Sequence, residues 1–99
     1  MLFAVYVTND NDQPGSYTAI TPDLPECATH GYELGQLLAR VHLKIEGHVV
    51  QLLLDNITPP RPRTLQELRK SGEFSAGALY EIYIEDHQLE AMAVHQAGK

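Results

Sequence analysis

The sequence contains a single cysteine, Cys27, and no tryptophan. One cysteine cannot close an internal disulfide, so nothing in the chain indicates an oxidising compartment. An apolar run of about 18 residues, as a membrane helix would need, is also missing. The first residues, LFAVYVT, lack the basic flank and the cleavage-site pattern of a secretion signal. We therefore expect a soluble, cytoplasmic protein with no membrane segment.

Basic residues are scarce as well. The 99 residues include 7 Lys and Arg against 13 Asp and Glu, a formal net charge of −6, and residues 1–35 contain no basic residue other than histidine. Neutralising phosphates supplies most of the affinity of nucleic-acid-binding proteins, so this balance argues against such a module. An acidic surface suits a basic protein partner, although mild acidity also simply aids solubility.

The longest amphipathic pattern predicts a helix that starts at about Glu33 and ends near Asp55. Apolar residues recur in steps of three and four along one face, with polar residues opposite. The members of this stripe are Leu34, Leu38, Val41, Ile45, Val49 and Leu52. Prolines 59, 60 and 62 then prevent the helix from continuing.

Strands are expected on both sides of this helix. Alternation and turn chemistry predict them at residues 2–8, 16–21, 26–30 and 78–85. The first strand is apolar on both faces, which indicates a central position. Residues 9–16 form a hairpin loop, and residues 22–25 form a proline-bracketed elbow. Thr64 and Glu67 form a capping box that starts a short helix, ending at about Lys70.

This order of elements predicts an α+β fold in two layers, with the long helix packed across one face of the sheet. We expect one domain over residues 1–99, with a core that ends at about residue 85 and a short tail over residues 86–99. Helix formers in the tail could cover the apolar end of the long helix. Another subunit could do the same, and would make the protein a homodimer or tetramer. The residues expected at such an oligomer interface are Val50, Leu53 and Leu54.

The residues that could form a catalytic or metal site are poorly spaced for either role. Cys27 and His30 are three apart on an expected strand and would face opposite sides, which is a poor nucleophile–base pair. The Asn9–Asp12 run lacks the ligand spacing of a calcium loop. His42 and His48 are six apart, unlike the i, i+4 spacing of helical zinc ligands. We expect no enzymatic activity, no metal and no cofactor.

Residues 17–56 carry a resemblance to a known family. A strand enters Pro22-Asp23-Leu24-Pro25-Glu26-Cys27, followed by Thr29, Gly31, a long helix and a proline-rich turn. This pattern resembles the HicB-like antitoxins, and order, spacing and loop chemistry agree over residues 1 to about 85. Glu26 replaces the usual elbow glycine, and Gly35–Leu37 replaces the usual acidic pair and alanine.

The resemblance implies a truncated RNase H-like fold, with three antiparallel strands and a fourth strand beside the first. It also implies a function: the domain would bind a small basic HicA-type ribonuclease toxin and cover its active face. The contacts expected from the elbow and the acidic sheet edge are Pro22, Asp23, Leu24, Pro25, Glu26, Glu81 and Glu85.

Two further expectations follow. The tail is too short and acidic for the usual DNA-binding segment of these antitoxins, so we expect no autonomous DNA binding. The basic group Arg61, Arg63, Arg69 and Lys70 is either a solvated surface or a weak contact to RNA or to an acidic subunit. The alternative to an antitoxin is a solitary HicB-like scaffold domain that forms homo-oligomers and has no cognate toxin.

Overall fold

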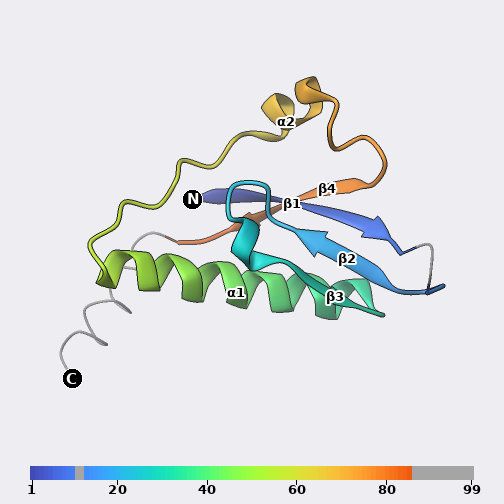
Figure 1. Ribbon diagram of the computed structural model, residues 1–99, viewed down its shortest axis with the longest axis horizontal. Helices are drawn as coiled ribbons and strands as arrows, with labels where there is room; N and C mark the ends of the chain where they lie inside the picture. Colours follow the sequence, from blue (N-terminus) through green and yellow to red (C-terminus); the bar gives the residue numbers. More distant parts are fainter. Residues whose placement is uncertain (11–12, 86–99) are drawn as a thin grey trace.

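The computed structural model describes residues 1–10 and 13–85 (Figure 1). The elements follow one another as β1 (Leu2–Asn9), β2 (Tyr17–Ile20), the 3-10 turn η1 (Pro25–Cys27), β3 (Thr29–Gly31), α1 (Leu34–Leu54), α2 (Leu65–Ser71) and β4 (Ala78–Tyr83). All neighbouring strands are antiparallel, in the order β3-β2-β1-β4. The predicted α+β class is confirmed, and β4 lies beside β1 as expected.

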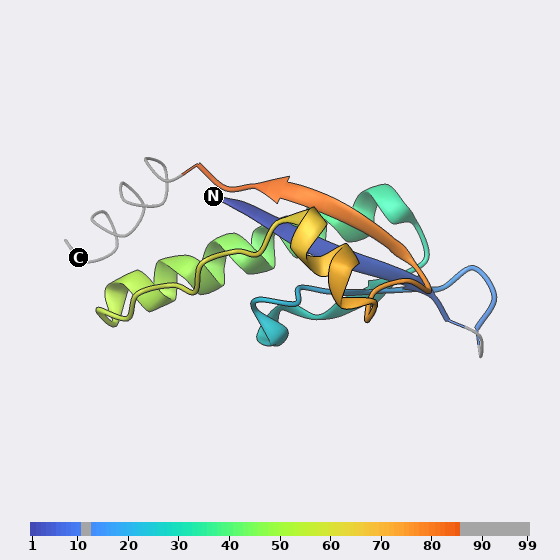
Figure 2. The same cartoon turned by 90° about the horizontal axis from the view of Figure 1, so that it is seen from above.

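The central position predicted for β1 is also correct. Phe3, Val5 and Val7 point to the face of the sheet that α1 covers, and all three are buried. Ala4 and Tyr6 point to the other face, where the α2 region lies (Figures 1 and 2). On that face Leu68 of α2 is fully buried, and the ring of Tyr6 meets the ring of Phe74 edge-on at 5.1 Å. For simplicity we call these the inner face (α1) and the outer face (α2).

The buried side of α1 is close to the predicted stripe but turned slightly from it. Its buried residues are Leu37, Val41, Ile45, Val49 and Val50. Leu34 and Leu38 are only partly buried against this core. Spacing predicts which residues share a face of α1. Packing against the four-stranded sheet then decides which of two adjacent residues on that face is buried. The predicted water-facing residues, among them Arg40, Lys44 and Gln51, are exposed.

Of the described elements, α1 and α2 begin and end close to where the sequence indicated. Glu33 precedes α1 and makes no side-chain cap, so this helix depends on its packing. Thr64 accepts from the backbone N–H of Glu67, and the Glu67 side chain accepts from the Thr64 N–H, which completes the predicted capping box. Gly72 ends α2 at φ 74°, in the left-handed region that glycine tolerates.

The elbow differs from the expectation. Residues 26–30 were predicted as a strand, but Pro25–Cys27 form a 3-10 turn and pairing with β2 begins only at Thr29. Pro25 occupies the first position of the turn, where its missing N–H costs nothing. Two successive backbone bonds close it, from Leu24 N to Thr21 O and from Cys27 N to Leu24 O, both 2.9 Å. The predicted tail helix lies outside the described residues.

Candidate protein-binding surfaces

The elbow between β2 and β3 was expected to contact a partner, and the structure divides its residues into two groups. Leu24 is buried beneath the turn, and Pro22 and Asp23 are partly covered. Pro25 and Glu26 are exposed. The buried group anchors the loop, and only Pro25 and Glu26 present most of their surface to a partner.

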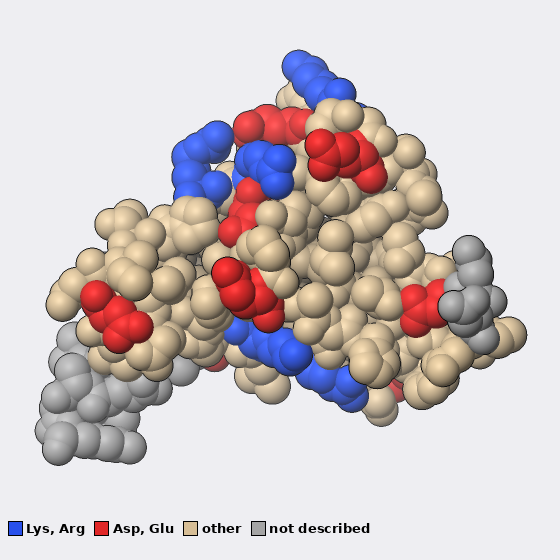
Figure 3. Space-filling view, in the orientation of Figure 1, with Lys and Arg blue, Asp and Glu red and all other residues tan. Residues whose placement is uncertain are grey.

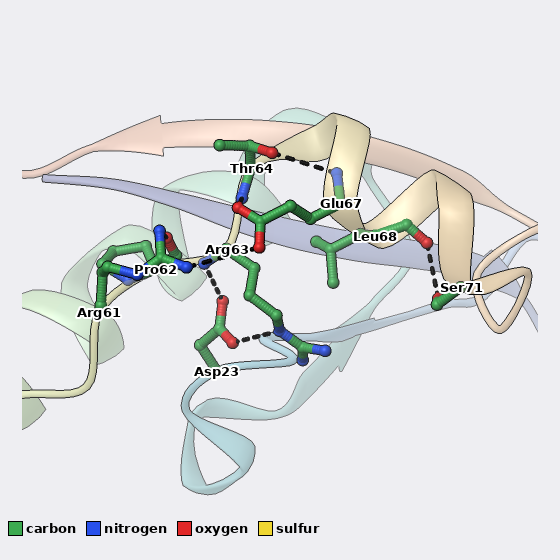
Figure 4. A network of polar contacts seen from close by, with 8 residues as sticks. All are labelled: Asp23, Arg61, Pro62, Arg63, Thr64, Glu67, Leu68 and Ser71. Carbon is green, nitrogen blue, oxygen red and sulfur yellow. Dashed lines mark hydrogen bonds and ion pairs between the residues drawn. The ribbon is translucent and has the colours of Figure 1, made fainter.

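Asp23 is held by a residue far along the chain. Its Oδ2 accepts from the backbone N–H of Arg63 at 2.8 Å, and its Oδ1 accepts from Arg63 Nε at 2.7 Å (Figure 4). The Asp23 side chain is only 9% exposed. Bidentate, charge-assisted bonds of this kind are among the stronger ones in proteins. The carboxylate therefore fixes the elbow against the connector that leads into α2, and is already occupied.

Charges of both signs surround the elbow. Glu26 lies 3.6 Å from His48 Nε2, and Arg61 lies 3.4 Å from Glu67. Figure 3 shows Lys and Arg side chains interspersed with Asp and Glu on this side of the molecule. The acidic residues of the stretch 1–35 therefore do not form an acidic field here, because the basic connector folds back beside them.

Glu81 and Glu85, the other expected contacts, lie elsewhere. Both are exposed, and β4 is the edge strand at the opposite end of the sheet from β3. Figure 2 shows the teal elbow and the orange β4 on opposite sides of β1. The predicted contact residues thus form two separate surfaces: the elbow surface (Pro25 and Glu26) and the β4 surface (Glu81 and Glu85).

The β4 surface includes two apolar residues that the sequence analysis did not single out. Tyr83 is 60% exposed and Leu2 is 50% exposed, and the two are direct partners across the β1–β4 ladder. The alternation of a strand over residues 78–85 is enough to place Tyr83 on the same face as Glu81. Pairing with Leu2 could not be inferred, because it depends on the register between β1 and β4, and Leu2 and Tyr83 are 81 positions apart in the chain.

The three residues expected at an oligomer interface differ in how much of their surface is exposed. Val50 is only 3% exposed and packs in the protein's own core, so it is not part of an exposed interface. Leu53 and Leu54 are partly buried against the same core. Ile57, which follows them, is 51% exposed. Of the original three, only Leu53 and Leu54 retain surface for another subunit.

Cys27 is buried in the hydrophobic core. Cys27 Sγ lies 3.6 Å from the carbonyl oxygen of Lys44, beneath α1. Burial raises the pKa of its thiol, and the nearby Glu26 carboxylate raises it further. A thiol held protonated is a weak nucleophile, and Cys27 packs among the buried residues of the core.

The described residues present neither a metal-binding cluster nor a helix that could span a membrane. Across residues 1–10 and 13–85, three or more His, Cys, Asp or Glu side chains do not gather in any arrangement suited to a metal ion. Over the same ranges, every helix is too short or too polar to cross a membrane.

Comparisons with known proteins agree with this architecture. The N-terminal domain of the Burkholderia pseudomallei antitoxin HicB is similar with a TM-score of 0.76 at 22% identity, covering 86% of this chain and 99% of that domain. The structure of that antitoxin itself gives a TM-score of 0.77 at 22% identity, covering 90% of this chain and 65% of that chain. These likenesses show a shared fold. A search of curated proteins finds no match.

A match to a family model shows, beyond the shared fold, which family this chain belongs to. The model described as the HicB-like antitoxin of bacterial toxin–antitoxin systems matches residues 3–96. The match spans nearly the whole sequence and includes the elbow, the long helix and all four strands. This chain belongs to the HicB-like antitoxins.

Proposed function

We propose that this protein is the antitoxin of a bacterial toxin–antitoxin pair and neutralises a small, basic HicA-type ribonuclease by covering its active face. Family membership over residues 3–96 is the observation that carries this proposal. The net charge of −6 supports it, because opposite charges accelerate association and improve complementarity. In this proposal the protein acts in the cytoplasm by binding alone and performs no catalysis.

The two surfaces do not support the proposal equally. The elbow surface lies among charges of both signs, since Arg63 binds Asp23 and Arg61 pairs with Glu67 on the connector, so it offers a basic partner little net attraction. At the β4 surface, Glu81 and Glu85 flank Tyr83 along one strand, and residues 78–85 include no Lys or Arg. An exposed aromatic side chain between carboxylates is a suitable anchor for an interface. We propose the β4 surface as the main toxin contact, with Pro25 and Glu26 as a secondary one.

The alternative function, a homo-oligomeric scaffold, rests on the far end of α1. Leu53, Leu54 and the exposed Ile57 form an apolar group there. A second subunit bound at this group would leave both toxin-contact surfaces free. Oligomerisation through this group is therefore compatible with toxin binding, and the scaffold function is the alternative only if the chain has no cognate toxin.

Co-expression with any small basic protein that is encoded next to this chain tests the proposal. We expect the two to co-purify as a stable complex, and we expect this chain to restore the growth of cells that express the toxin. A matched pair of variants sharpens the result. Glu81→Lys with Glu85→Lys should impair rescue, whereas Gln51→Lys, on the solvent side of α1, should not. Failure of the wild-type chain to bind or rescue would overturn the antitoxin proposal.

A further inference from the structure

The two edge strands of the sheet, β3 and β4, differ in whether their outward main-chain groups have hydrogen-bond partners. At the β3 edge, Arg40 Nη1 of α1 donates to the carbonyl of His30 at 2.8 Å. One turn later Lys44 Nζ donates to the carbonyl of Ala28 at 3.0 Å. Side chains of the long helix thus take up main-chain acceptors on this edge. Covering an edge in this way protects it from pairing with another chain.

Among the described residues, the β4 edge has a strand partner on one side only, β1. Met1 and Ile84 exchange both backbone hydrogen bonds, at 2.6 and 2.7 Å. Bonded and non-bonded pairs alternate along an antiparallel ladder, so Phe3–Ile82 and Val5–Tyr80 are bonded pairs too. The backbone groups of the intervening residues, Leu79, Glu81 and Tyr83, must then point away from β1.

These outward groups have no partner in the described part of the chain. None of the hydrogen bonds among residues 1–10 and 13–85 reaches the main-chain N–H or C=O of Leu79, Glu81 or Tyr83. A row of unpaired donors and acceptors on an edge strand is a template for another strand. Peptides commonly bind proteins in this manner, with backbone bonds for affinity and alternate side chains for specificity.

The side chains beside this edge define what would pair with it. Glu81, Tyr83 and Glu85 alternate along the outer face, with Leu2 next to Tyr83. Neighbouring strands place their side chains directly opposite one another, where opposite charges attract and like charges repel. A fitting strand therefore carries Lys or Arg opposite the two carboxylates and an apolar residue over Tyr83.

A second copy of this chain fits less well. Antiparallel pairing of two β4 strands would bring two copies each of Glu81 and Glu85 onto one face of one strand pair. Like charges in adjacent strands are destabilising, so the acidic edge discourages self-pairing while it attracts a basic segment. The acidic charge of the β4 edge therefore favours a basic segment over a second copy of this chain.

We propose that the β4 edge accepts an extended, basic segment of the toxin as a fifth strand of the sheet. This proposal rests on the proposed antitoxin function and specifies its binding mode. The sheet order becomes β3-β2-β1-β4 followed by the partner strand, and the backbone groups of Leu79, Glu81 and Tyr83 supply the new hydrogen bonds.

Two substitutions at one position test the pairing. Glu81→Thr and Glu81→Pro both remove the carboxylate, but only proline also removes the outward N–H and places its ring at the pairing edge. Proline is tolerated on edge strands where the N–H faces outward, so the β1–β4 ladder should survive. Circular dichroism and thermal melting of both variants verify the fold.

The readouts are the dissociation constant for the basic protein that co-expression identifies as the partner, and amide hydrogen exchange. We expect Glu81→Thr to bind more weakly than wild type, and Glu81→Pro to bind about tenfold more weakly again. In the wild-type complex, the amides of Leu79, Glu81 and Tyr83 should become protected from exchange.

The possible failures are distinguishable. If the wild-type chain forms a complex but the threonine and proline variants bind alike and the three amides stay unprotected, strand pairing is wrong and the antitoxin function stands. If wild type forms no complex, both proposals fall. If the free protein is a dimer that Glu81→Pro converts to monomer, the edge serves a second copy, and the basic-segment proposal is overturned.

Discussion

The carboxylate of Asp23 binds Arg63 twice, accepting from its backbone N–H at 2.8 Å and from its Nε at 2.7 Å. The two residues are 40 positions apart, one in the elbow after β2 and the other in the connector before α2. This contact joins the loop at one side of the sheet to the segment that crosses its outer face. Asp23, expected to bind a partner, therefore has a role within the fold itself.

Replacing Asp23 tests that role. Asp23→Ala should lower the free energy of unfolding by about 2 kcal/mol, because it removes two charge-assisted hydrogen bonds and leaves a backbone donor without its acceptor. Arg63→Ala should cost less, about 1 kcal/mol, since its side chain is 40% exposed and the backbone bond survives. Urea denaturation of both variants measures the two values.

The double variant provides the control. If the two residues act as a unit, the effect of Asp23→Ala with Arg63→Ala should be smaller than the sum of the single effects. Arg61→Ala, which removes an exposed ion pair with Glu67, should leave stability unchanged within error. An Asp23→Ala protein as stable as wild type would show that the contact contributes nothing to the fold.

The local elements could be predicted because their signals lie within a few residues of one another. The Thr64–Glu67 capping box, the end of α2 at Gly72 and the start of α1 after Glu33 all have short-range causes. The central position of β1 was also predictable, since both of its faces are apolar. Each of these features needs no knowledge of what lies across the fold.

The features that could not be predicted from the sequence depend on contacts between segments that are far apart in the chain. Arg63 and Asp23 each looked like surface charges, and their pairing follows from the path of the connector. Val50 looked like surplus apolar surface, but the rotation of α1 on the sheet buries it. The separation of Glu26 from Glu81 follows from the strand order. The candidate residues could be predicted as a list, and their arrangement into two surfaces could not.

Gly77, just before β4, lies where the chain passes very close to Val7 and Thr8 of β1. A Cβ built there would lie 2.2 Å from the carbonyl oxygen of Val7 and 2.8 Å from Thr8 Cγ2. Gly77→Ala must therefore push β4 away from β1, and we expect a loss of about 2–3 kcal/mol in unfolding free energy. Chemical denaturation measures it. A variant with wild-type stability would mean that the strand start moves freely.

Gly47 is the matched opposite case. It lies on the exposed side of α1, and a Cβ there would meet no atom within 4 Å. Glycine is less favourable than alanine in a helix interior, so Gly47→Ala should raise stability by about 0.5–1 kcal/mol. The same denaturation experiment shows the gain. A loss instead would reveal a partner or a packing constraint on this side of α1.

Asp10 should contribute to stability in a way that depends on pH. Hydrogen bonds from Ser16 and Thr18, both 2.6 Å, lower the pKa of its carboxyl below the ordinary value. A group with a lower pKa in the folded state stabilises the protein above its unfolded pKa, and this contribution is lost as pH falls through the folded pKa. Stability should therefore decline in the acid range, from roughly pH 5 downward.

Asp10→Asn isolates this contribution, because asparagine does not titrate. Its unfolding free energy should fall less steeply with acid than that of wild type. The remaining slope includes Glu67, whose pKa is lowered by the Thr64 backbone bond. Identical acid profiles for wild type and Asp10→Asn would contradict the assignment.

Charge reversal on the two candidate surfaces should have unequal effects on toxin association. Glu81→Lys with Glu85→Lys places two positive charges where a basic partner approaches, so the association rate at low salt should fall about tenfold. Glu26→Lys adds a positive charge beside His48 and close to a connector that is already basic, and should slow association less. Stopped-flow mixing at several salt concentrations measures both.

Salt separates an electrostatic effect from a packing effect in this experiment. Exposed charges are screened over about 8 Å at physiological ionic strength, so the difference between wild type and the Glu81/Glu85 variant should shrink as salt rises. A difference that persists at high salt would indicate direct contacts and would support strand pairing at β4. If Glu26→Lys alone slows association, the toxin approaches through the elbow, and the order of the two surfaces must be exchanged.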